Sequence, residues 1–134
     1  MLAAFPLLAI PVAIYNALVF AAPDVLDGSL GSIRLLSGDG WRIGTGDLLL
    51  AAGLILLYLE IFKSTRTGTA SIVDHTLSML LFIVCLLEFV ALDGFATSVF
   101  FLLTLMTLID VVAGFTVTIS TARRDFGIDD RARL

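Results

Sequence analysis

The long apolar runs of this chain constrain its fold more than any other feature. The run from Ile72 to Leu92 contains only three ionisable side chains, which are Asp74, His75 and Glu88. A helix needs about 20 mainly apolar residues to cross the hydrocarbon of a bilayer. Hydrophobic residues make up 59% of the chain and charged residues 15%, whereas soluble domains average about 45–50% and about 25%. The sequence therefore predicts a membrane protein.

Four such runs fill most of the chain, and they predict an all-α polytopic membrane protein. Helices are favoured because lipid offers a backbone amide no hydrogen-bond partner outside its own segment. The first run is expected to be a retained span and not a signal peptide, because no Lys or Arg precedes it. We predict one four-transmembrane-helix bundle over residues 1–124, with spans at about residues 2–22, 47–62, 72–92 and 95–121.

Basic residues are divided unevenly between the two sides of this predicted bundle. Six of the eight Lys and Arg residues lie between spans two and three or after span four, and only Arg34 and Arg42 lie on the other side. An excess of Lys and Arg marks the cytoplasmic side of a membrane protein. Both termini are therefore predicted to be cytoplasmic, with residues 125–134 as a mobile tail. Size and topology suggest a bacterial inner membrane.

The outer loop, residues 23–46, is long for a connection between neighbouring helices. It contains Asp39-Gly40 between two β-prone runs, which predicts a short extracytoplasmic β-hairpin with a type I′ turn. Trp41 beside this turn suits a membrane interface. We consider two roles for Asp39, Gly40 and Trp41: a docking loop for another subunit, or an ordered lid on the bundle itself.

Three ionisable residues inside the predicted spans form the main candidate site. Helices that fold back on each other bring mirrored positions to the same depth, since each residue rises about 1.5 Å. This geometry places Glu60, His75 and Asp110 at one level in the cytoplasmic half of the membrane. Such a group could pass protons or hold a cation. It could equally be a structural latch, in which His75 bonds one acid and Lys63 or Arg66 neutralises the other.

Small and hydroxyl-bearing residues recur at helical spacing on spans three and four. Residues of this kind line close contacts between membrane helices, and they would also line a narrow polar path. Packing is the favoured interpretation. The residues are Ser78, Cys85 and Glu88 on span three, and Thr104, Thr107, Asp110 and Gly114 on span four.

The start of span three has two further candidate features. Ser71 and Asp74 have the spacing of a capping box, so they are predicted to cap the first amides of this helix. Lys63 and Arg66 precede it and could contact a lipid phosphate, because helix N-termini attract anions. Two cations are also the ordinary pattern of a cytoplasmic loop.

The sequence predicts no catalytic, cofactor-binding or metal-binding residues. It has no Walker loop, dinucleotide fingerprint, nucleophile elbow or HExxH motif. Its formal net charge of −4 and its membrane setting argue against nucleic-acid binding. We expect membrane lipids as partners, and a function as a homo-oligomer or an accessory subunit of a larger membrane complex. The alternative is a proton- or cation-conducting protein that uses Glu60, His75 and Asp110.

Overall fold

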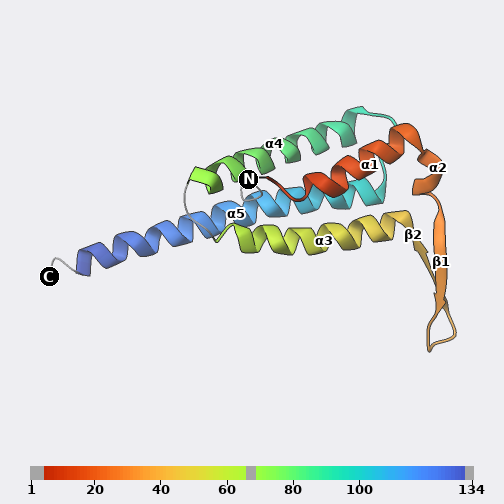
Figure 1. Cartoon of the computed structure of the whole chain (residues 1–134), viewed down its shortest axis with the longest axis horizontal. Helices are drawn as coiled ribbons and strands as arrows, with labels where there is room; N and C mark the ends of the chain where they lie inside the picture. Colours follow the sequence, from red (N-terminus) through yellow and green to blue (C-terminus); the bar gives the residue numbers. More distant parts are fainter. Residues whose placement is uncertain (1–4, 66–68, 132–134) are drawn as a thin grey trace.

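Three long apolar helices make up most of the structure. The computed structural model describes residues 5–65 and 69–131 (Figure 1). Three of its helices are long and apolar enough to cross a membrane, which is the pattern of a membrane protein. In chain order the elements are α1 (Ala9–Ala21), α2 (Pro23–Leu26), β1 (Ser29–Arg34), β2 (Gly40–Gly44), α3 (Thr45–Lys63), α4 (Thr69–Ala91) and α5 (Ser98–Arg131).

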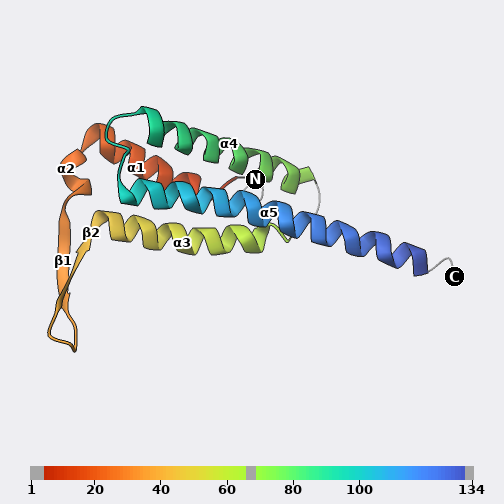
Figure 2. The same ribbon diagram turned by 180° about the vertical axis from the view of Figure 1, so that it is seen from behind.

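Helix α5 is the central element of the bundle. It lies between α3 and α4 and packs against both, as Figure 1 and Figure 2 show from opposite sides. Helix α1 packs against α3 and α5. Glycines of α3 face α5 at close range: a Cβ on Gly46 would lie 2.6 Å from Val99 Cγ2, and one on Gly53 would lie 3.0 Å from Met106 Sδ. Small residues at these points let the two helices approach closely.

Helix α1 is shorter than the predicted first span. It begins at Ala9 and has 13 residues, which corresponds to about 20 Å of helix against about 30 Å of hydrocarbon. Pro11 occupies the first turn of α1, where a missing backbone N–H costs nothing, and residues 5–8 precede the helix without regular structure. Pro6 and Pro11 therefore delay the start of the helix. A bundle of four complete spans is not confirmed.

Helix α5 is longer than the predicted fourth span. It continues from residue 121, the predicted end of the span, to Arg131, within the segment predicted as a tail. This segment contains no proline and only one glycine, Gly127, so its backbone can continue the helix. The mobility of this end stays a prediction.

The segment between α2 and α3 forms the predicted antiparallel hairpin, but its turn lies elsewhere. Leu35 N–H donates to the Asp39 carbonyl at 2.8 Å, and Gly38 N–H donates to the Leu35 carbonyl at 2.9 Å. The loop is therefore residues 36–38, with Gly38 at a φ of +93°, which suits glycine in a three-residue hairpin loop. The predicted Asp39-Gly40 turn is wrong, because Asp39 closes the loop and Gly40 begins β2.

The hairpin stands away from the helices. It projects sideways from the end of the bundle where α3 begins (Figure 1), which we call the hairpin end. Its base is fixed by Asp47, whose carboxylate accepts a 2.8 Å hydrogen bond from Gly44 N–H. The lid interpretation does not fit this arrangement, because a lid would lie across the helices.

Candidate functional site

A half-buried lysine organises the end of the bundle opposite the hairpin. Lys63 Nζ lies 2.7 Å from Glu60 Oε2 and 2.8 Å from Asp74 Oδ1. It also donates to the backbone carbonyl of Phe5 at 2.7 Å. A lysine ammonium has three donors, and each has an acceptor here. We call Lys63, Glu60 and Asp74, with the backbone of Phe5 and Leu7, the Lys63 cluster.

Glu60 connects this cluster to the segment that precedes α1. Its side chain is 1% exposed, and it lies three residues before Lys63, on the same side of α3. One carboxylate oxygen accepts from Lys63, and the other accepts from the backbone N–H of Leu7. The cluster thus ties the start of the chain to α3 and α4.

Asp110 approaches the same region from α5. It is 6% exposed, and Ser78 and Asp74 of α4 and Lys63 of α3 lie near its carboxylate. Glu60 and Asp110 therefore lie at the same end of the bundle, and the shared membrane depth expected for Glu60, His75 and Asp110 stays a prediction. The cation that pairs with Glu60 is Lys63, which also pairs with Asp74.

His75 packs against a different part of α5. A Cβ added at Gly114 would lie 2.6 Å from His75 Cε1 and 2.7 Å from its Nδ1, so the ring rests directly on this glycine. His75 Nε2 lies 3.4 Å from Ser71 Oγ, and the ring centroid lies 6.0 Å from that of Phe115. The predicted depth of His75 in the membrane could not show which neighbour its ring faces. Adjacent residues on a helix point about 100° apart, so Asp74 faces Lys63 while His75 turns toward Gly114.

The other features predicted near this site can also be placed. Helix α4 begins at Thr69, so Ser71 lies inside its first turn and not before it. The Asp74 carboxylate accepts from Lys63 Nζ, and an ion pair replaces the predicted cap. Lys63 is directed into the protein by the same bonds, away from the predicted lipid phosphate contact. Arg66 lies outside the described residues.

The polar faces of α4 and α5 meet in the middle of the bundle. Ser78, Cys85, Thr104 and Thr107 are all buried. Thr104 Oγ1 donates to the Phe100 carbonyl at 2.9 Å, and Thr107 Oγ1 donates to the Thr104 carbonyl at 2.7 Å. Hydroxyl groups bonded to their own helix in this way are satisfied without water. This geometry favours packing over a polar path.

Two side chains hold α1 in place near the hairpin end, and the sequence did not predict the partners of either. Asn16 Nδ2 donates to Glu88 Oε2 of α4 at 3.2 Å. Tyr15 Oη lies 2.6 Å from Thr97 Oγ1 and 3.3 Å from the Gly94 carbonyl. The only indication in the sequence was that Tyr15 and Asn16 are polar residues inside an apolar run.

Across residues 5–65 and 69–131, no group of three or more His, Cys, Asp or Glu side chains is arranged to hold a metal ion. In comparisons with known proteins, no family matches the chain, and neither a curated protein nor a solved structure matches it. Any functional assignment therefore depends on the geometry of the chain itself.

Proposed function

We propose that this chain is a small integral membrane protein that acts without catalysis, by self-association into a homo-oligomer through its hairpin. The observation that carries the proposal is the uncovered apolar face of that hairpin. An interaction protein needs a surface that its own fold leaves open, and the hairpin provides one.

The two faces of the hairpin differ in chemistry. Ile33 pairs with Trp41 across the strands, and Ser32 pairs with Arg42. Paired residues share a face and successive residues alternate, so one face is apolar and the other is polar and basic. Ile33 and Trp41 are each 51% exposed. A lone two-stranded hairpin is marginal in water, so covering this apolar face would stabilise it.

Charge complementarity supports a second copy as the partner. Arg34 and Arg42 are the only basic residues that precede Lys63 in the sequence. Asp24 and Asp27 lie exposed at the same end of the bundle. Because the hairpin projects away from its own helices (Figure 2), its arginines would complement the acidic end of a neighbouring copy in the same membrane.

The proposal includes an orientation. Most Lys and Arg residues follow the end of α3 in the sequence, and the hairpin carries only two. The positive-inside rule then assigns the Lys63 end to the cytoplasm and the hairpin to the outside of a bacterial inner membrane.

Site-specific photo-crosslinking in native membranes tests the proposal. A photoreactive phenylalanine analogue at Trp41 should capture a second copy of this chain. The same analogue at Ser32, on the opposite face of the same strand pair, is the matched control and should capture far less. Native mass spectrometry with surrounding lipid should show the same oligomer.

Two outcomes would overturn self-association. Capture of a different membrane protein at Trp41, with no adduct between copies, would make the chain an accessory subunit of a larger complex. Capture of lipid alone, with a monomer by native mass spectrometry, would make the hairpin a membrane-surface anchor.

One observation favours a second candidate function, proton or cation conduction. Three buried carboxylates, Glu60, Asp74 and Asp110, lie near the half-buried Lys63, the one cation that is ion-paired with any of them among the described residues. Burying unpaired charge is costly, so this region would favour a bound proton or small cation. Acids inside membrane helices often mark such paths.

Flux measurements separate this candidate from a structural cluster. In proteoliposomes, Asp110→Asn should abolish proton or potassium flux if the cluster conducts. Thr116→Val, on an exposed position of the same helix, should leave flux unchanged. The absence of any flux from the unmodified protein would exclude conduction.

A further inference from the structure

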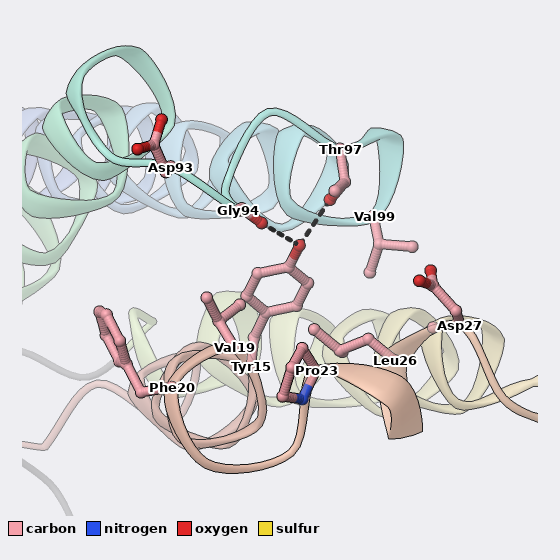
Figure 3. A pocket seen from close by; sticks show the side chains of 11 residues that line it. Tyr15, Val19, Phe20, Pro23, Leu26, Asp27, Asp93, Gly94, Thr97 and Val99 are labelled. Carbon is pink, nitrogen blue, oxygen red and sulfur yellow. Dashed lines mark hydrogen bonds between the residues drawn. The ribbon is translucent and has the colours of Figure 1, made fainter.

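A half-open cavity of about 480 Å³ lies at the hairpin end of the bundle. Residues of α1 and α2, of the connection between α4 and α5, and of the first turns of α3 and α5 surround it, and Figure 3 shows how they lie. Small-molecule sites have volumes of about 300–1,000 Å³, so this cavity is large enough for an organic ligand.

Tyr15 forms a rigid part of the cavity wall. The side chain is 1% exposed, and its hydroxyl is bonded to Thr97 Oγ1 and to the Gly94 carbonyl (Figure 3). Its ring centroid lies 4.8 Å from that of Phe100. Gly94 has a φ of +85°, and a Cβ there would lie 2.9 Å from Val19 Cγ1. The wall is therefore formed before any ligand binds.

The lining combines apolar surface with negative charge. Val19, Phe20 and Leu26 contribute apolar side chains, and Asp27 and Asp93 contribute carboxylates. The residues that line the cavity include no Lys or Arg. In Figure 3 the two aspartates lie on either side of the Tyr15 ring.

We propose that this cavity binds hydrophobic organic cations, such as aryl- or alkyl-substituted ammonium and phosphonium ions. The apolar body of the ligand would lie against Val19 and Leu26, and Phe20 would offer a ring face to the charge. Asp27 and Asp93 attract a cation and repel an anion of the same size. This inference does not depend on self-association.

A pair of ions matched in shape tests the charge selectivity. Tetraphenylphosphonium and tetraphenylborate differ mainly in the sign of their charge. Equilibrium dialysis of the purified full chain in neutral detergent should show saturable binding of the cation and only unsaturable partitioning of the anion. Binding of the cation should weaken as salt is raised, because salt screens exposed charges.

Variants connect the binding to this cavity. Asp27→Asn with Asp93→Asn should weaken cation binding by about tenfold or more, since the site loses both negative charges. Asp24→Asn is the matched control, because this acid shares helix α2 with part of the lining but does not line the cavity. Leu26→Trp, which fills the cavity, should also reduce binding while thermal unfolding stays unchanged.

Three results would overturn the inference. These are the absence of saturable cation binding, equal binding of the cation and the anion, and cation binding that survives the double asparagine substitution. The photo-crosslinking at Trp41 is read out separately, so either proposal can fail while the other stands.

Discussion

Lys63 Nζ lies 2.8 Å from Asp74 Oδ1, and this ion pair joins the last residue of α3 to the second turn of α4. Elsewhere α5 separates these two helices (Figure 1). The pair is therefore a direct link between the outer layers of the bundle, and Glu60 extends it to Leu7, in the segment that precedes α1.

Removal of the lysine charge should destabilise the bundle strongly. Lys63→Met keeps most of the side-chain volume but leaves Glu60 and Asp74 buried without their cation. Breaking a buried ion pair in this way costs about 3–5 kcal/mol. Unfolding in mixed micelles with increasing dodecyl sulfate measures the loss. Adding Glu60→Gln to Lys63→Met should restore part of the lost free energy of unfolding. If Lys63→Met alone lowers the free energy of unfolding by less than about 1 kcal/mol, the cluster is not a latch.

Tyr15 should contribute through its hydroxyl as well as its ring. Tyr15→Phe removes the contacts to Thr97 and Gly94 and should lower the free energy of unfolding by about 1 kcal/mol. Tyr58→Phe is the control, because Tyr58 is 64% exposed on α3 and its substitution should have little effect. Equal losses in the two variants would contradict the assigned role.

Gly114 should tolerate no larger side chain while His75 is present. Alanine normally favours a helix over glycine, so Gly114→Ala would stabilise α5 if the position were open. The His75 ring lies 2.6 Å from where the new Cβ would be, and we expect a net loss of about 1–3 kcal/mol from overpacking. In a His75→Ala background the same substitution should become neutral or stabilising. Thermal unfolding of the four proteins forms the double-mutant cycle.

The hairpin loop can be tested with two neighbouring glycines. Gly38→Ala should destabilise the hairpin by about 1–2 kcal/mol, because Gly38 has a left-handed φ and an alanine is less stable in that conformation by about this free energy. At Gly40 a Cβ would meet nothing within 4 Å, so Gly40→Ala should have little effect. Hydrogen exchange of the Leu35 amide reports the change, since this amide donates to the Asp39 carbonyl. The opposite order of effects would indicate the two-residue Asp39-Gly40 turn.

The long helices could be predicted from sequence, because the length of an apolar run is almost enough to identify a membrane-spanning helix. The hairpin was predictable for a similar reason, since turn residues between β-prone runs indicate strands. Its exact loop was not, because Gly38 and Gly40 both flank Asp39 and either could have supplied the turn. The start of α1 depended on how the chain accommodates Pro6 and Pro11.

The sequence indicated which polar residues gather at one end of the bundle, but not which of them face one another. Counting residues from the loops brought Glu60 and Asp110 to one end of the bundle, where the structure has them. The rotation of each helix about its axis decides which neighbour faces the site, and long apolar runs reveal little of that rotation. For this reason the sequence could not show that Lys63 would pair with Glu60 while His75 packs against Gly114.

The short α1 has a consequence for the order in which the chain can assemble. Leu7 precedes the helix, so its backbone N–H needs a partner from outside its own segment, and that partner is Glu60 of α3. A backbone amide in hydrocarbon is costly until it is bonded. Residues 5–8 precede α3 in the chain, so the partner of the Leu7 amide becomes available only after α3 has been synthesised. The segment before α1 should therefore reach its final position only after α3 is in place.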